Sequence, residues 1–297
     1  MKLKIWFVAI RPQFLVLSVV LAFLGTSIAW YDGSFSLGLA LLAFIGLLLA
    51  HVSVNVLNDY FDYRSGIDLK VKRTPFSGGS GVLPAGLLTP RQVFWLGMAS
   101  FLLIVPIGVY FLILRGWLLL PLLLIGILCI FIYTPFVLKT RWPEWAAGLG
   151  LGALPVLGIY FVQTAAYTLP LIVAAVPSGI LVHNLLLLNE FPDVDADRTA
   201  NRKTLPIIMG KKRAGVVYSV LTVVVYLWII GGVVAGQMPP FSLIALLTLP
   251  LAIKAIQGAL KPQEMDKLVP AMANNVLVVL LTQLLLGIGY ILARVTG

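Results

Sequence analysis

The sequence of 297 residues contains little charge and almost no cysteine. Charged residues make up 11% of it and apolar residues 60%, whereas soluble domains carry roughly a quarter charged residues. This shortage of charge excludes an ordinary soluble domain and indicates a chain that resides in a lipid bilayer. The single cysteine, Cys129, excludes an internal disulfide and argues against a thiolate zinc site, so we expect it to serve in packing.

Long apolar stretches recur along the whole chain. Each is near the ~20 residues that a helix needs to cross a hydrocarbon core of ~30 Å. They lack the polar and apolar alternation of a membrane barrel, and helices satisfy their own backbone hydrogen bonds within lipid. We therefore predict an all-α fold, a polytopic membrane helical bundle of about nine transmembrane helices. The stretches are 14–30, 37–57, 93–114, 118–136, 145–162, 169–188, 216–235, 241–259 and 268–292.

Membrane topology, rather than nucleic-acid binding, explains the net charge of +10. If the N-terminus is cytoplasmic, 19 of the 21 Lys and Arg residues fall in cytoplasmic segments, and only Arg115 and Arg294 lie outside. This positive-inside bias predicts a multi-pass protein of the cell (plasma) membrane whose polar loops face the cytoplasm. The basic loops would also attract anionic substrates or membrane lipid. The first helix is too long for a signal-peptide core, so we expect it to be retained as an anchor.

Two polar segments resemble each other. Both spell Asn, an acid, two spacers, Asp, a further Asp, two bases and Thr, at an offset close to 130 residues. This offset corresponds to about four helices, so we predict one domain, 1–297, built of two four-helix pseudo-repeats (about 1–140 and 141–265) and a ninth helix. The first motif comprises Asn58, Asp59, Asp62, Asp68, Lys72, Arg73 and Thr74, and the second comprises Asn189, Glu190, Asp193, Asp197, Arg202, Lys203 and Thr204.

The acids of both motifs are expected to face one another at one membrane boundary. Ionised carboxylates there repel one another and resist desolvation, so they need compensating cations. Oxygen ligands without a His or Cys cluster favour Mg²⁺, which commonly bridges carboxylates to substrate phosphates. The predicted metal ligands are Asn58, Asp59, Asp62, Asp68, Asp193 and Asp197, with Asp195 in the same cluster. Flanking bases and amides suit the phosphate groups, namely Asn58, Lys72, Arg73, Asn189, Arg202 and Lys203.

Other polar residues have plainer explanations. A single charged loop would be explained by topology alone, but two matching clusters at helix ends favour a bound cation. His51 and His183 are expected to be hydrogen-bonded polar residues within the bundle. Segment 76–81 is rich in Gly and Ser but lacks the lysine and strand of a nucleotide-binding loop, so we expect a flexible lid or a plain linker.

At these residues the chain resembles the UbiA superfamily of intramembrane prenyltransferases. The similarity extends over the Arg11–Pro12 opening, both acidic motifs, the nine-span layout and segment 133–139. It implies that Asn58, Asp62, Asp193 and Asp197 bind Mg²⁺ and a diphosphate, with Asp68 as the third acid of the first motif. In the commoner spacing that acid follows four residues after Asp62, whereas here position 66 is Gly66 and Asp68 comes two later.

The resemblance also implies roles outside the motifs. Lys139 and Arg73 would neutralise the diphosphate, and Tyr133 would lie near the allylic carbon. Segments 158–164 and 185–189 look most like the branch that prenylates 1,4-dihydroxy-2-naphthoate during menaquinone synthesis. The expected catalytic residues are Asp62, Asp68, Asp193, Asp197 and Tyr133, and candidates for an aromatic wall around the allylic cation are Tyr60, Phe61, Tyr63, Tyr133 and Tyr160.

The expected function is Mg²⁺-dependent transfer of a polyprenyl group from prenyl diphosphate to a lipophilic aromatic acceptor. One alternative is an ether-lipid prenyltransferase of the digeranylgeranylglyceryl phosphate synthase type, and haem or chlorin prenylation is a further one. An anion transporter is the alternative of another class. A transporter needs a site reachable from both membrane faces, whereas these acids gather at one face.

Overall fold

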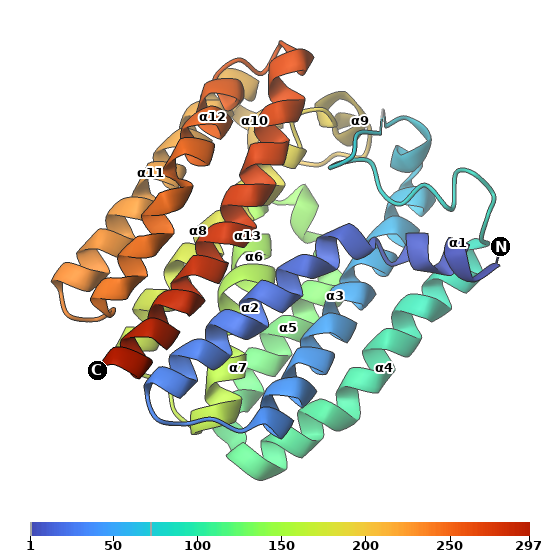
Figure 1. The fold of residues 1–297 in the computed structure, drawn as a ribbon. Helices are drawn as coiled ribbons and strands as arrows, with labels where there is room; N and C mark the ends of the chain where they lie inside the picture. Colours follow the sequence, from blue (N-terminus) through green and yellow to red (C-terminus); the bar gives the residue numbers. More distant parts are fainter. Residues whose placement is uncertain (1, 72) are drawn as a thin grey trace.

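The computed structural model describes residues 2–71 and 73–297 as an all-helical bundle without strands (Figure 1). The helices are α1 (Lys2–Ala9), α2 (Pro12–Tyr31), α3 (Leu37–Ser65), α4 (Pro90–Arg115), α5 (Leu120–Ile132), α6 (Glu144–Gly148), α7 (Leu154–Thr164), α8 (Leu169–Asn189), α9 (Val194–Thr199), α10 (Leu205–Met209), α11 (Lys211–Val234), α12 (Leu249–Ala259) and α13 (Met265–Thr296). Four 3-10 segments join them, at Ile67–Leu69, Trp117–Leu119, Val137–Lys139 and Pro240–Thr248. A π-helical turn, Leu149–Ala153, connects α6 to α7.

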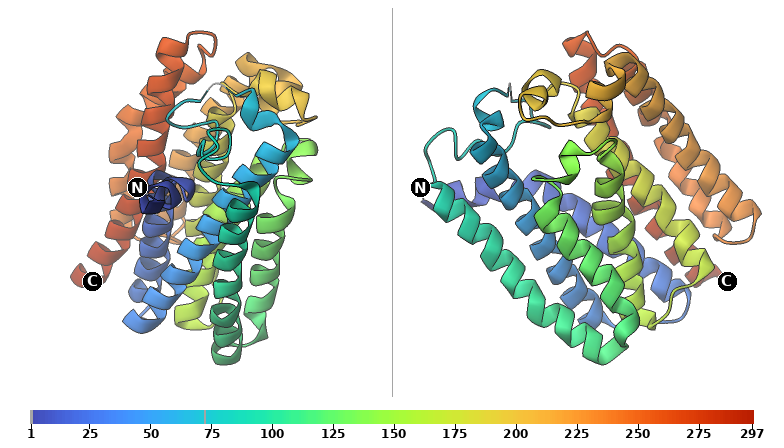
Figure 2. Two further views of the ribbon diagram at one scale, coloured as in Figure 1. Left: turned by 90° about the vertical axis from the view of Figure 1, so that its right-hand side faces the viewer. Right: turned by 180° about the vertical axis from the view of Figure 1, so that it is seen from behind.

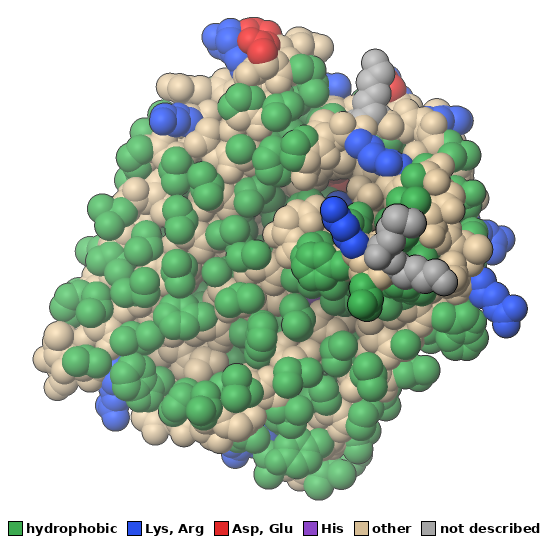
Figure 3. Space-filling view, turned by 45° about the vertical axis from the view of Figure 1, so that its right-hand side comes forward, with side chains coloured by type: hydrophobic (Ala, Val, Ile, Leu, Met, Phe, Trp, Pro, Cys, Tyr) green, Lys and Arg blue, Asp and Glu red, His purple; other side chains and the backbone are tan. Residues whose placement is uncertain are grey.

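Eight continuous helical segments of the described chain are long and apolar enough to cross a membrane. A ninth apolar helix, Trp117–Ile132, is shorter. Each of the nine predicted stretches coincides with one of these helices, so the prediction of an all-α polytopic membrane bundle is confirmed; eight of the helices are long enough to span, and the one at 118–136 is shorter than predicted. Hydrophobic side chains cover most of the face in Figure 3, as expected for helices that contact lipid.

The bundle packs around α2, α7, α8, α11 and α13, whose buried side chains form the largest apolar core. Glycines allow the backbones to approach closely, as in other membrane bundles. A Cβ at Gly152 would lie 2.5 Å from the carbonyl oxygen of Ser178, and one at Gly258 would lie 2.6 Å from that of Lys267. Because these glycines lack a Cβ, the π-helical turn can pack closely against α8, and α12 can pack closely against α13.

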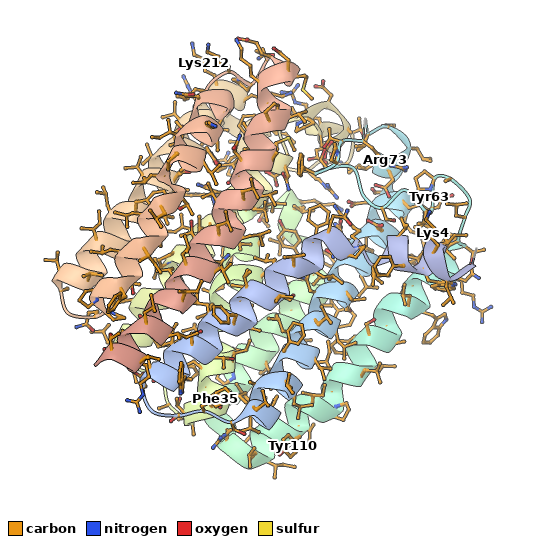
Figure 4. The ribbon with its side chains drawn as sticks, viewed as in Figure 1. Lys4, Phe35, Tyr63, Arg73, Tyr110 and Lys212 are labelled. Atoms are coloured by element: carbon orange, nitrogen blue, oxygen red, sulfur yellow. The ribbon has the colours of Figure 1, made fainter. Side chains whose placement is uncertain are left out.

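The short polar elements gather at one end of the bundle. The 3-10 turn after α3 contacts α9 there, and the views in Figure 2 show the segment between α3 and α4 beside α9. In Figure 4, Arg73 and Lys212 lie toward this end, whereas Phe35 and Tyr110 lie at the other. The two acidic motifs, far apart in sequence, are thereby brought together.

Candidate active site

A cavity of about 230 Å³ opens between the two acidic motifs. Its polar end is formed by the last turns of α3, the 3-10 turn after it, and the segment from the end of α8 through α9. Its side walls come from α2, the end of α5 and α8. The predicted site residues that line it are Asn58, Asp62, Asp68, Tyr133, Asn189, Asp193, Asp197 and Arg202.

The first motif reaches the cavity from α3, where Asn58 and Asp62 lie one turn apart and so share a face. The side-chain amide of Asn58 donates to Thr134 Oγ1 at 3.0 Å, which fixes its orientation. Asp68 follows on the 3-10 turn after Gly66, whose φ of 80° ends the helix. Burial, followed by the charges of Asp62 and Asp59, raises the pKa of Asp68 to about 7.

The second motif differs because Pro192 cannot continue α8, which ends at Asn189. A short turn leads to Asp193, which precedes α9, and Asp197 lies one helical turn later. Burial and then the charge of Asp197 raise the pKa of Asp193 to about 7. Asp195 is not part of the cluster, contrary to prediction. It lies on the opposite face of α9, its side chain is 92% exposed, and it pairs with Arg198.

Arg202 joins the two motifs. Its guanidinium forms an ion pair with the carboxylate of Asp62 and donates to Asp197 Oδ1 at 2.9 Å. The side chain is only 12% exposed, so these charges attract each other with little screening by water. Arg202 alone contacts acids of both motifs among the described bases.

Asp59 points away from the cavity. Its carboxylate accepts from the backbone N–H of Ser80 at 3.0 Å and lies 3.8 Å from the Arg11 guanidinium. This geometry favours a role in holding segment 76–81 in place, rather than the metal role predicted for Asp59. Ser77 and Gly78 of that segment line the cavity, and the Ser77 hydroxyl donates to Asp193 Oδ1 at 3.4 Å.

Most of the other predicted bases lie around the rim. Arg73 donates through Nε to the Gly78 carbonyl, and its charge opposes the rise in the pKa of Asp68. Lys139 lines a neighbouring cavity that also contains Asp62 and Arg202. Lys203 is exposed and is tied to Leu138 through its backbone N–H. The predicted role of Lys72 falls outside the described residues.

The aromatic candidates separate into different places. Tyr133 lines the polar cavity, and Phe61 lines the neighbouring one. Tyr60 and Tyr63 pack instead against an apolar cluster formed by α1, α3 and α4. Tyr160 donates to Asp32 Oδ2 at 2.6 Å, between the loop after α2 and α7, so the prediction that it lines the site is wrong. The signal that could have excluded it is its position near the end of span 145–162, which the predicted topology places on the outer side.

The two histidines make structural hydrogen bonds, as expected. His51 Nδ1 pairs with Ser18 Oγ at 2.9 Å and connects α3 to α2. The Nε2 atom of His183 accepts from Trp142 Nε1 at 2.8 Å, and its Nδ1 atom lies 3.1 Å from Asn184 Oδ1.

The donor set around the cavity fits a hard divalent cation. Five carboxylates line it, four of them from the predicted ligands, together with the side-chain amides of Asn55, Asn58 and Asn189; Arg11 and Arg202 are the arginines among its lining residues. No three His, Cys, Asp or Glu side chains within the described ranges already converge at metal-binding distance. Asp62 and Asp197 are instead held by Arg202, so cation binding requires these side chains to rearrange.

An apolar cavity of about 300 Å³ adjoins the polar one. It lies among α3, α4, α5 and α7 and is lined by aliphatic and aromatic side chains, glycines and Cys129. Four residues line both cavities and define the neck between them: Val54, Cys129, Gly150 and Leu151. The site therefore offers a charged compartment next to an apolar one.

Sequence reasoning missed three charged residues of this region. Arg11 lines the cavity next to Phe14, in a left-handed backbone conformation with φ of 55°; its place just before Pro12 was the available signal. Glu190 was noted only as an acid of the second motif, yet it lines the cavity. Glu144, at the start of α6, is fully buried and carries no sequence signal beyond being an acid beside a span.

Comparisons with known proteins agree with this geometry. The sequence model described as the UbiA prenyltransferase family matches residues 17–289. A 1,4-dihydroxy-2-naphthoate octaprenyltransferase of Bacillus subtilis is 28% identical over 89% of this chain and 85% of its own length. The Haemophilus influenzae protein of the same name is 26% identical over 98% and 97%. The structure of a UbiA homolog from Archaeoglobus fulgidus bound to GPP and Mg²⁺ has a TM-score of 0.61 at 14% identity and covers 95% of this chain and 99% of that one.

Proposed function

Because the chain belongs to the UbiA prenyltransferase family, we propose that it transfers a polyprenyl group from a prenyl diphosphate to 1,4-dihydroxy-2-naphthoate, a step of menaquinone synthesis. The observation that carries this proposal is that a polar and an apolar cavity adjoin and share four lining residues. A prenyl diphosphate has a highly anionic head and a long apolar tail, and the site has one compartment suited to each. A transporter would require a site open to both faces, whereas the two acidic motifs meet at one end of the bundle.

The acids and bases of the polar cavity would hold the diphosphate. Asn58, Asp62, Asp68, Asp193 and Asp197 are the proposed ligands for Mg²⁺, supported by their oxygen donors and by the Mg²⁺-bound homolog. When bound, Mg²⁺ supplies positive charge that favours cleavage of the allylic C–O bond. Further proposed contacts to the diphosphate come from the bases and amides around the cavity, Arg73, Lys139, Asn189, Arg202 and Lys203.

The chain's own residues then protect and orient the allylic cation. The apolar cavity excludes water from it, and the ring of Tyr133 is the aromatic group best placed to face it. A dihydroxynaphthoate is electron-rich at the ring carbon that carries its carboxylate, so attack from that carbon can be followed by loss of CO₂. The names of the two bacterial relatives support this acceptor.

We also propose that the protein resides in the cell membrane with the polar cavity facing the cytoplasm. The asymmetry of Lys and Arg in the sequence supports this orientation. The lipophilic acceptor and the diphosphate head would then enter at the charged end, while the prenyl tail stays within the membrane.

A labelled acceptor tests the proposal directly. Purified protein should release labelled CO₂ from carboxyl-labelled 1,4-dihydroxy-2-naphthoate only when prenyl diphosphate and Mg²⁺ are both present. Asp62→Ala and Asp193→Ala should abolish release, whereas Asp195→Ala, which alters an exposed acid of the same loop, should retain it. If no CO₂ is released and the prenyl group is attached instead to a glycerol phosphate lipid, the acceptor is wrong and the ether-lipid alternative is correct.

A further inference from the structure

The polar cavity extends well beyond the acids, toward the middle of the bundle. Its lining residues on α3 include His51, Asn55, Asn58 and Asp62, which are spaced by four, three and four residues and so share one helical face. At 1.5 Å per residue, His51 lies about 10 Å from Asn58 and about 16 Å from Asp62 along the helix axis. The deep part of the cavity, at the level of His51, is therefore separate from the acids that would hold a diphosphate.

Different faces of α3 line the two cavities at this depth. Ala43, Leu47 and Ala50 line the apolar cavity together with residues of α4 and α5. His51 and Asn55 line the polar cavity together with residues of α2 and α8. A prenyl tail that enters the apolar cavity through the neck thus leaves the side between α2, α3 and α8 to the second substrate. The acceptor is the molecule that must occupy it.

The deep part of the polar cavity suits a flat aromatic ring. Its walls are apolar, with Leu17 from α2, Leu151 from the π-helical turn, and Val182 and Leu185 from α8. His51 brings a polar side chain into these apolar surroundings. Small-molecule sites commonly combine apolar walls with a few polar groups that fix the orientation of the ligand. His51 is in the position to serve as such a group.

The ring of His51 is held at one nitrogen only. Its Nδ1 atom lies 2.9 Å from Ser18 Oγ on α2, and the residue is only 3% exposed. Within the described ranges no further hydrogen bond reaches the His51 side chain, so Nε2 is the ring nitrogen left for a molecule in the cavity that His51 lines. His183 differs, because Trp142 and Asn184 engage both of its ring nitrogens.

We propose that Nε2 of His51 binds a ring hydroxyl of the acceptor, with Ser18 holding the imidazole in place. This inference rests on the proposed function and names the residue that positions the aromatic substrate. A hydroxyl both donates and accepts, so it suits Nε2 in either tautomer of the histidine. An aromatic compound without that hydroxyl would leave a buried nitrogen unpaired, which costs free energy. His51 thereby selects a hydroxylated acceptor.

Two variants separate substrate binding from a purely structural link between α2 and α3. His51→Asn places an amide near the position of Nδ1, so it keeps a partner for Ser18 and removes the group at Nε2. Ser18→Ala does the reverse, because it breaks the link and leaves Nε2 in the cavity wall. Loss of one neutral hydrogen bond should raise the acceptor KM of His51→Asn about 10-fold, and that of Ser18→Ala by a smaller factor. Mg²⁺-dependent binding of a prenyl thiolodiphosphate should stay unchanged in both, reporting an intact fold.

Acceptor analogues test the contact itself without turnover. The fluorescence of the naphthol ring reports equilibrium binding of 1,4-dihydroxy-2-naphthoate and of the two analogues that each lack one hydroxyl. The wild-type protein should bind one of the analogues about 10-fold more weakly than the parent compound, and His51→Asn should bind these two compounds equally. His183→Asn is the matched control and should keep the wild-type preference, because His183 is buried but is not among the residues that line the cavity.

Each remaining outcome decides the question. If His51→Asn keeps the acceptor KM and the analogue preference of the wild type, or if Ser18→Ala loses as much as His51→Asn, His51 does not hold the hydroxyl, although the proposed function survives. If the wild-type protein transfers nothing to the dihydroxynaphthoate, the proposed function fails. The binding measurements then still decide the inference: equal affinities of the wild type for all three compounds would overturn it, and a preference lost only in His51→Asn would support it.

Discussion

At the scale of single residues, Arg202 links the two acidic motifs in a way that neither motif reveals. The bases at the end of the second motif were expected to contact a phosphate, and Arg202 instead pairs with Asp62 and Asp197. A guanidinium can exchange these carboxylates for phosphate oxygens, because both groups present two acceptor oxygens to its paired N–H donors. Arg202 therefore acts as a structural cation between the two motifs and is available to a diphosphate when one binds.

Removing Arg202 should destabilise the protein. Arg202→Met leaves two buried carboxylates without their cation, and breaking a buried pair in this way costs about 3–5 kcal/mol. Arg198→Met is the control, since Arg198 pairs with an exposed Asp195 and such surface pairs contribute about 0–1 kcal/mol. Thermal unfolding in detergent measures both. Equal melting temperatures for the two variants would contradict the structural role of Arg202.

The pKa values of Asp68 and Asp193, both about 7, predict a pH dependence. Because these values exceed the ordinary 3.8, the folded metal-free protein binds more protons than the unfolded chain. The stability that protonation contributes should be lost as pH rises from about 4 to above 7. Chelator-treated protein should therefore have a lower melting temperature at pH 8 than at pH 5, and Mg²⁺ with diphosphate should raise it more at pH 8. Equal effects at both pH values would argue against these acids as ligands.

At the scale of elements, segment 76–81 is folded against the acids rather than free. Gly79 has φ of 71°, and a Cβ there would lie 3.2 Å from Asp59 Oδ1 and 3.3 Å from Asp68 Oδ1. The segment thus passes close to the carboxylates because it has no side chain at this point. The prediction of a lid or linker described its composition correctly but could not place it over the site.

Gly79→Ala should impair activity more than it impairs stability. Any Cβ at this φ costs roughly 1–2 kcal/mol, and here it also displaces Asp68. Gly86→Ala is the matched control, with φ of 64° and no atom within 4 Å of its Cβ. We expect the two variants to have similar melting temperatures. Gly79→Ala should lose more prenyl-transfer activity than Gly86→Ala. Equal activities would show that the segment does not position the acid.

The π-helical turn between α6 and α7 places Gly150 at the neck of the two cavities. A Cβ at Gly150 would lie 2.9 Å from Cys129 Sγ, on the wall that both cavities share. Gly150→Leu should therefore block passage of a long prenyl tail while dimethylallyl diphosphate is still used. Product analysis with donors of increasing length measures this, with Gly231→Leu on the outer surface of α11 as the control. Unchanged use of long donors by Gly150→Leu would show that the tail takes another path.

At the scale of the whole molecule, the site depends on both acidic motifs lying at the same face of the membrane. Loops with most of the Lys and Arg residues are predicted to face the cytoplasm, and the labelled Arg73 and Lys212 lie opposite Phe35 and Tyr110 in Figure 4. Both halves of the chain thus present their acidic motif at one end of the bundle.

Cysteine labelling measures this orientation. In a Cys129→Ala background, cysteines at Lys139 and Lys203 should react with an impermeant thiol reagent only from the cytoplasmic side, because both positions are exposed at the charged end. A cysteine at Gly33, in the loop between α2 and α3, should react only from outside. Labelling of the first two from outside would reverse the proposed topology.

By itself, the sequence determined the class of fold and the main composition of the site. Hydropathy over ~20 residues located the eight long spans and the shorter apolar helix, because crossing a bilayer is a property of each segment alone. The repeated motif identified Asp62, Asp193 and Asp197 because four-residue spacing places side chains on one helical face. The division into pseudo-repeats remains a prediction of the same kind.

Only the tertiary structure decided which of the many polar residues act together. In the folded chain Asp59 lies beside Arg11, and Asp195 is exposed. Tyr160 lies away from the site, where it bonds to Asp32, and Arg202 pairs with Asp62. It also brought Glu144, Glu190 and Tyr133 to one wall, although they come from three different elements. These outcomes depend on how helices distant in sequence pack and rotate against one another, and no local pattern of residues specifies that.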